Sequence, residues 1–121
     1  MPKSSPDLDR IFYALADPAR RGILERLSHG PAPVGELARP LPMSLPSVMQ
    51  HIGILEAEGL VRSEKVGRVR MCRLEPDTLR DAERWISARR TEWEHRLDRL
   101  GDYLSTLGDQ GEPRGADDDA R

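Results

Sequence analysis

The sequence predicts a mainly helical domain of the α+β class, in which four helices precede a β-hairpin and a long helix ends the fold. Three observations indicate this order. Apolar residues recur at helical spacing through the first half of the chain. Two β-type segments then surround Gly67, and leucines recur every three or four residues from Leu97 onwards. The 121 residues are enough for one domain with a modest core.

Two helices are expected at the start of the domain, which we place at residues 7–107 after a flexible arm of residues 1–6. The first helix spans residues 8–16. The second begins at Asp17 and Pro18, because aspartate is a good N-cap and the fixed φ of proline suits the first helical position. The apolar stripes of the two helices are Leu8, Ile11, Phe12, Leu15, Ala16, Ile23, Leu24 and Leu27.

A short helix, a stiff turn and a capped helix are expected next. The short helix covers residues 34–39, and the sequence PLPM at 40–43 ends it, since proline disfavours helix in the residue before it. Ser44 then caps a helix that runs to about Glu58. This order is typical of a helix-turn-helix, whose second helix lies in the DNA major groove. The inward face of that helix is expected to hold Val48, Ile52, Leu55 and, as an open fourth position, Leu45.

Two strands at residues 60–65 and 69–74 are predicted to form a hairpin, with a glycine supplying the positive φ of its turn. If Val66 faces Val69, one face packs on the core and the other is polar. Between residues 59 and 73, five cationic side chains and one carboxylate give a net charge of +4, although the whole chain carries −2. Such a basic hairpin makes the helix-turn-helix winged. The predicted core face is Val61, Ser63, Cys72 and Leu74.

Residues 77–107 are predicted to form one long helix. From Ile86 its apolar residues follow heptad-like steps of 7, 4, 3, 4 and 3, although two arginines interrupt the first part. Part of this stripe is expected to pack within the chain, and Trp85 to pack on its own subunit or across a dimer. Residues 108–121 are polar and acidic, which predicts a disordered tail. The full stripe is Leu79, Ala82, Ile86, Trp93, Leu97, Leu100, Leu104 and Leu107.

The capped helix and the hairpin both supply candidate DNA contacts. Gln50 can bind adenine through two hydrogen bonds, and Leu45 can contact a thymine methyl group. His51 is expected either to contact phosphate or to hydrogen-bond within the fold. Arg68 at the hairpin tip is the best candidate for the minor groove, where negative potential is concentrated. Each feature alone is common on solvated surfaces, but their combination in this order favours DNA binding. The predicted contacts are Ser44, Leu45, Ser47, Val48, Gln50, His51, Arg62, Lys65, Arg68 and Arg70.

Several segments resemble the ArsR family of bacterial repressors. They are FYALADPARR at 12–21, Glu36-Leu37, SLPSVMQHI at 44–52, LEAEGLV at 55–61 and Gly67-Arg68. The resemblance covers about residues 8–107 and implies a sequence-specific, homodimeric repressor on a palindromic operator, with its own promoter as one candidate. It also implies that the first and last helices form the dimer interface, with half-sites about 34–36 Å apart. The dimerisation residues so implied are Leu8, Ile11, Phe12, Leu15, Ile86, Trp93, Leu97, Leu100 and Leu104.

The chain departs from the family pattern at two places. Metal-sensing relatives carry a Cys-x-Cys in the short helix or paired Asp/His sets on the last helix, whereas this chain has VGELA at 34–38 and a single His95. Because zinc needs about four ligands, we expect no metal and no cofactor. Met49 occupies a position where the family commonly has serine, which removes one potential hydrogen bond to DNA.

No catalytic residues are expected, and the lone Cys72 is expected to be a small buried hydrophobe. The absence of an apolar signal segment and of an 18-residue apolar run predicts a cytoplasmic protein without a membrane partner. Two alternatives stay open. One is a winged-helix module that docks a protein instead of DNA, and the other is the same regulator controlled by a metal or by oxidation of Cys72.

Overall fold

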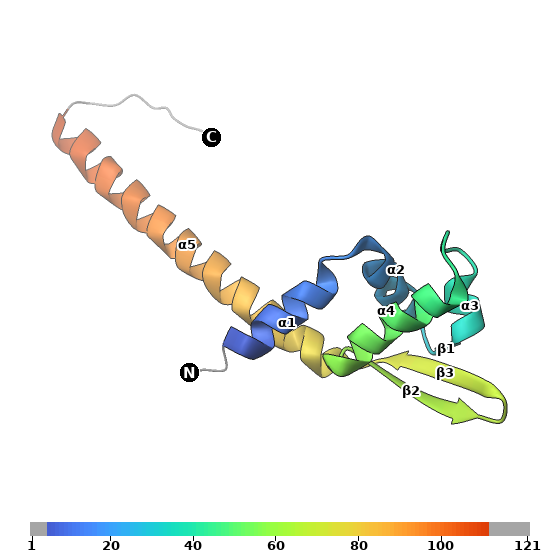
Figure 1. Cartoon of the computed structure of the whole chain (residues 1–121). Helices are drawn as coiled ribbons and strands as arrows, with labels where there is room; N and C mark the ends of the chain where they lie inside the picture. The colour runs from blue at the N-terminus through green and yellow to red at the C-terminus, as the bar shows by residue number, and fades with distance from the viewer. Residues whose placement is uncertain (1–4, 112–121) are drawn as a thin grey trace. The chain divides into compact units, whose positions relative to one another are not determined.

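Five α-helices and three β-strands make up the part of the chain that the structure describes (Figure 1). This structure is a computed structural model, and it describes the backbone of residues 5–111 and the side chains of residues 7–108. The element order confirms the predicted mainly helical, winged helix-turn-helix class. The elements are α1 (Ser5–Leu15), α2 (Pro18–Leu27), β1 (Ala32–Pro33), α3 (Val34–Ala38), α4 (Leu45–Ala57), β2 (Val61–Val66), β3 (Val69–Leu74) and α5 (Pro76–Gly111).

Three details differ from the expectations drawn from the sequence. α1 begins at Ser5, inside the expected flexible arm. α5 continues through Gly108 to Gly111, because a glycine costs a helix only about 1 kcal/mol relative to alanine. β1 is an additional strand, and its two residues are too few to show the alternation that marks strands. The remainder of the expected arm and tail, residues 1–4 and 112–121, lies outside the described residues.

Side-chain caps start α2 and α4 as predicted. Asp17 accepts a hydrogen bond from the backbone N–H of Arg20 at 3.1 Å, and Pro18 occupies the first turn. Ser44 accepts one from the backbone N–H of Ser47 at 3.3 Å. Each cap satisfies a backbone N–H group that has no partner within the helix. The local sequence therefore fixes where α4, the second helix of the helix-turn-helix, begins.

The hairpin has the predicted register. Val66 pairs with Val69 across a turn in which Gly67 adopts a φ of 67°, a conformation that favours glycine. β1 pairs with the other edge of β3, so that the sheet order is β1-β3-β2. Val61 and Cys72 are buried, which confirms the predicted core face of the hairpin.

An aliphatic core fills the first of two compact units, which ends at Glu83. α4 packs against α2, α3 and β2, so its inward face lies within this core. The apolar side chains of this unit thereby cover one another. The buried core residues are Ala14, Ile23, Leu24, Leu27, Ala32, Val34, Leu37, Val48, Ile52, Leu55, Leu60, Val61 and Cys72.

The second unit begins at Arg84 and consists, within the described residues, of the rest of α5. Almost every side chain between residues 84 and 107 is exposed. The predicted stripe is present on this helix and remains uncovered in the single chain. Its exposed large hydrophobic residues are Trp85, Ile86, Trp93, Leu97, Leu100, Tyr103, Leu104 and Leu107.

Candidate nucleic-acid interface

α4 presents two chemically different faces. Val48 and Ile52 are buried in the core, whereas Leu45, Met49 and Gln50 are exposed. The prediction that Val48 contacts DNA is wrong, because its side chain is 0% exposed and lies one helical turn from Ile52 on the inward stripe. Leu45 is 54% exposed and therefore belongs to the outward face, not to the core.

The polar groups at the start of α4 are only partly available. The Ser44 hydroxyl donates a hydrogen bond to the Ser47 hydroxyl at 3.1 Å, in addition to its capping contact. Gln50 is exposed and forms no hydrogen bond within the described part of the chain. Its amide can therefore meet a base edge without breaking an existing contact.

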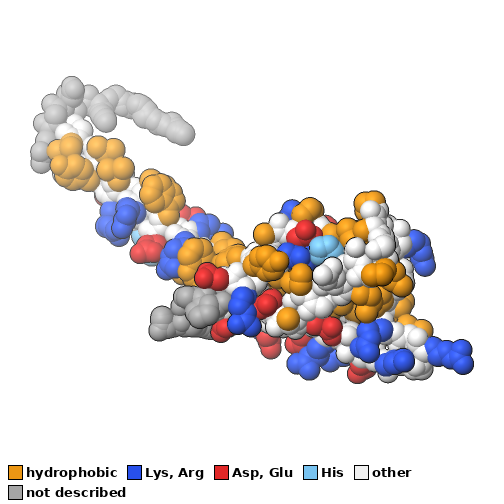
Figure 2. Space-filling view, in the orientation of Figure 1, with side chains coloured by type: hydrophobic (Ala, Val, Ile, Leu, Met, Phe, Trp, Pro, Cys, Tyr) orange, Lys and Arg blue, Asp and Glu red, His pale blue; other side chains and the backbone are white. Residues whose placement is uncertain are grey.

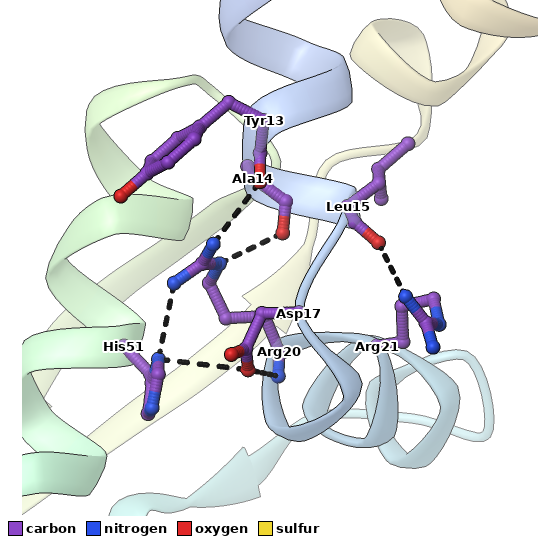
Figure 3. Close-up of polar contacts among 7 residues, drawn as sticks. All are labelled: Tyr13, Ala14, Leu15, Asp17, Arg20, Arg21 and His51. Carbon is purple, nitrogen blue, oxygen red and sulfur yellow. Dashed lines mark hydrogen bonds and ion pairs between the residues drawn. The ribbon is translucent and has the colours of Figure 1, made fainter.

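His51 points from α4 toward α2 rather than toward the exposed face (Figure 3). Its Nδ1 lies 3.2 Å from Nη1 of Arg20 and 3.9 Å from the Asp17 carboxylate. Because arginine only donates hydrogen bonds, the contact with Arg20 uses Nδ1 of a neutral imidazole as the acceptor. Of the two expectations for His51, the structure supports a contact within the fold, made with side chains.

Arg20 is the buried centre of this network, with 5% of its surface exposed. Its Nε donates to the Ala14 carbonyl at 2.8 Å, and its Nη2 donates to the Tyr13 carbonyl at 3.0 Å. Arg21 adds a hydrogen bond to the Leu15 carbonyl at 2.9 Å (Figure 3). These carbonyls end α1, where a helix supplies too few donors of its own. Arg20 thus joins the end of α1, the start of α2 and the side of α4.

Sequence reasoning missed Arg20, although its position was informative. It precedes Ile23 by three residues and Leu24 by four, so it occupies the buried stripe of α2. A cation in a core position needs hydrogen-bond partners, and the α1 carbonyls provide them. The neighbouring Asp17 has a lowered pKa, chiefly because its carboxylate accepts the backbone N–H of Arg20; burial opposes this effect, and the positive charge of the Arg20 guanidinium reinforces it.

The wing cations divide into paired and unpaired residues. Arg62, near the base of the hairpin, forms an ion pair with Glu75 at 3.0 Å. Lys65 and Arg68, at the tip, are exposed and form no hydrogen bond or ion pair with any described residue. Figure 2 shows basic side chains gathered along the lower edge of the molecule, where β2 and β3 lie in Figure 1. The tip is therefore the part of the wing most ready to bind phosphate.

Hydrogen bonds connect the wing to α4. Arg70 of β3 donates to the Ser63 hydroxyl at 3.1 Å, and Ser63 donates to the Glu56 carboxylate at 2.6 Å. Arg70 is thus engaged in holding the hairpin against α4. The nearby Cys72 is fully buried, and its pKa is raised first by burial and then by the negative charge of Glu56. A raised pKa reduces the thiolate fraction, which argues against a thiol switch at Cys72.

The predicted dimerisation residues differ in how much of each side chain is exposed in the single chain. Ile11 is only 5% exposed in the single chain and has little surface left to bury against a second copy, so its prediction is wrong. Leu8, Phe12 and Leu15 are half-buried. Tyr103 is a further exposed side chain of α5 that the predicted stripe does not include. The exposed α5 members of the prediction are Ile86, Trp93, Leu97, Leu100 and Leu104.

The described residues form neither a metal site nor a membrane-spanning helix. Among residues 5–111, no three His, Cys, Asp or Glu side chains come close enough to hold a metal ion. His29 follows α2, and His95 lies on α5. None of the helices in this part of the chain combines the length and apolar character that crossing a membrane requires.

The order of α3, turn, α4 and basic wing defines a winged helix-turn-helix protein of the DNA-binding class. Residues 15–64 match the family model of a helix-turn-helix domain. The chain is similar to the HTH-type transcriptional regulator Rv2034 of Mycobacterium tuberculosis, with 43% identity over 78% of this chain and 92% of that protein. It is also similar to the transcriptional repressor SdpR of Bacillus subtilis, with 29% identity over 65% of this chain and 88% of that protein.

Solved structures agree with these relatives. The crystal structure of the ArsR family transcriptional regulator RHA00566 has a TM-score of 0.73 and 48% identity, covering 78% of this chain and 97% of that one. An ArsR-like transcriptional regulator from Rhodococcus sp. RHA1 has a TM-score of 0.68 and 33% identity, covering 80% and 92%. The chain therefore belongs to the ArsR family of transcriptional regulators, which are helix-turn-helix DNA-binding proteins and not enzymes.

Proposed function

We propose that this regulator is a sequence-specific, homodimeric repressor that acts in the cytoplasm on a palindromic operator, with its own promoter among its targets. The observation that carries the proposal is the pair of unpaired cations, Lys65 and Arg68, on a wing whose base is bonded to α4. These cations can bind phosphates without leaving another partner, while the exposed Gln50 meets base edges. Arg62 and Arg70 already have protein partners, so we rank them as secondary DNA contacts.

The second unit supports the dimer. Trp93, Leu97, Leu100 and Leu104 follow heptad-like spacing and are each about half exposed in the single chain. A contiguous apolar stripe of this size marks an interaction surface. A second copy covers both stripes at once and brings two recognition helices to one duplex. The similarity to a relative named as a repressor favours repression over activation.

The test begins with duplexes selected from a random pool by the full-length protein. We expect an inverted repeat with half-sites about one helical turn apart, and two protomers per duplex in analytical ultracentrifugation. Gln50→Ala should weaken binding by about 1–3 kcal/mol and relax the preference at one base pair. Glu83→Ala, which alters an exposed side chain on α5, is the control and should bind as the wild type does.

Two outcomes would contradict the proposal. A complex of one protomer per duplex would exclude the dimeric operator. No enrichment of any duplex, even at low salt, would exclude DNA binding and favour the alternative of a module that docks a protein. A reporter placed behind the promoter upstream of the coding sequence separates repression from activation, because repression requires lower expression when the protein is present.

A further inference from the structure

The outward side of α4 carries an apolar stripe. Leu45, Met49 and Gly53 follow one another at four-residue spacing and therefore lie along one side of the helix. Leu45 is 54% exposed and Met49 is 40% exposed. No heavy atom lies within 4 Å of the position that a Cβ would occupy on Gly53. The stripe is thus open along two turns of the helix.

The same helix offers few groups that can recognise bases through hydrogen bonds. Residues 44–57 contain no lysine or arginine. Ser44 and Ser47 bond to each other, and His51 faces Arg20 of α2. Gln50 is the one exposed side chain of the helix with a free amide in the described structure. Hydrogen bonds from α4 can therefore distinguish only a few base pairs. Selecting one base over another at the remaining positions requires contacts other than hydrogen bonds.

We propose that Leu45 and Met49 recognise the methyl groups of thymines in the major groove, so that each preferred half-site has thymines where these side chains meet it. The inference rests on the proposed function and deepens it by naming the chemistry of the selected DNA. Thymine is distinguished in the major groove by its C5 methyl group. Apolar side chains gain free energy by covering a methyl group, and the flexible thioether of methionine adapts to its position. Gly53 leaves room for the helix backbone to approach the bases closely.

The neighbouring charges favour DNA over a protein as the occupant of this stripe. The wing is bonded to α4 through Ser63 and Glu56, and its tip presents the unpaired Lys65 and Arg68. A ligand that covers both surfaces must combine exposed methyl groups with dense negative charge. Duplex DNA that contains thymine has both properties along one groove.

The test removes one methyl group at a time from the DNA and leaves the protein intact. The probe is the duplex selected by the wild-type protein, with each thymine replaced in turn by deoxyuridine, which pairs identically. We expect binding to weaken by about three- to fivefold at one or two positions in each half-site, the effect of uncovering one methyl group. The other thymines should tolerate the replacement.

Three variants assign the sensitive positions. Met49→Leu should keep the sensitivity to deoxyuridine, whereas Met49→Ser should lose it at one position and Leu45→Ala at another. Equal binding of every deoxyuridine duplex by the wild type would overturn this inference and leave DNA binding intact. If no duplex is selected at all, the proposed function fails, and the apolar stripe is then assigned to a protein partner.

Discussion

The two units of the chain treat their apolar side chains in opposite ways. In the first unit, the aliphatic residues of α2, α3, α4 and the sheet cover one another, and even the buried Arg20 has hydrogen-bond partners. In the second unit, the apolar residues of α5 between 84 and 107 remain largely exposed. The difference indicates that the first unit is stabilised by its own core, and under the proposed dimer the second unit gains stability when a second copy covers its stripe.

The largest expected effect is a difference in the free energy of unfolding between two variants. One truncates a buried leucine of the first unit, and the other truncates an exposed leucine of the second. Leu55→Ala removes a fully buried side chain of α4 and should lower the free energy of unfolding by about 2–5 kcal/mol. Leu97→Ala removes a side chain that is 46% exposed, and should change the stability of the monomer by no more than about 0.5 kcal/mol. Urea denaturation at high dilution measures both values. Equal losses would contradict the distinction between the two units.

The exposed leucine of α5 should matter more for association than a buried residue of the core. Sedimentation equilibrium of Leu97→Ala should give a weaker dimer than that of the wild type, because each copy loses part of its exposed stripe. A conservative core change, Ile23→Val, is the control: it should cost about 1 kcal/mol of stability and leave the dissociation constant unchanged. An unchanged dimer in Leu97→Ala would place the interface elsewhere.

An arginine from each unit sharpens the comparison. Arg20→Ala leaves the Tyr13 and Ala14 carbonyls and the His51 ring without their donor, so we expect a loss of about 3 kcal/mol. Arg89→Ala removes an exposed pair with Glu92 and a contact of the guanidinium with the Trp85 ring, and should cost no more than about 1 kcal/mol. Thermal unfolding of both variants checks the difference, with Arg21→Ala as the control for a single exposed hydrogen bond to α1.

The N-cap of α2 gives the first unit an acid-sensitive contribution to stability. The pKa of Asp17 is lowered in the folded protein, so this contribution is present above the ordinary value of 3.8 and is lost as the pH falls through the lower, folded value. Asp17→Asn keeps a good capping residue without a titrating group, and its stability should lack this part of the acid dependence. Asp17→Ala should lose about 1 kcal/mol at neutral pH. Identical acid profiles for wild type and Asp17→Asn would contradict the role of the carboxylate.

The smallest expected effect is the change in stability when either of two helix glycines of the first unit is replaced by alanine. Gly22 and Gly53 both have open space at the Cβ position, so replacing either with alanine should raise stability by up to about 1 kcal/mol. Only Gly53→Ala should weaken DNA binding, because Gly53 lies on the outward stripe of α4. Fluorescence anisotropy with the selected duplex distinguishes the two variants. Equal affinities would show that the backbone near Gly53 does not approach the bases.

The sequence was sufficient for features that depend on local signals. Apolar spacing, the caps at Asp17 and Ser44, and the turn at Gly67 predicted the element order and the hairpin register. These signals act within a few residues, so a single sequence displays them directly. The predictions of a dimer and of an operator came from the resemblance to the family, not from these local signals.

Contacts between distant segments could not be predicted in the same way. The Arg20–His51 contact joins residues 31 apart, and the Glu56–Ser63 contact depends on how the hairpin lies on α4. Val48 was assigned both to the core and to DNA, and only its burial decided between them. The pairing of Arg62 with Glu75 likewise shows that a cation in a basic segment is not necessarily available to phosphate.

The most direct test of the account is the salt dependence of binding to the selected duplex. The double variant Lys65→Ala with Arg68→Ala removes the two unpaired cations at the wing tip, so the slope of log affinity against log salt concentration should become shallower by about two. Arg80→Ala, which lies in a surface pair with Asp77 on α5, should leave the slope unchanged. A double variant with the wild-type slope and affinity would contradict the assignment of the wing tip to DNA.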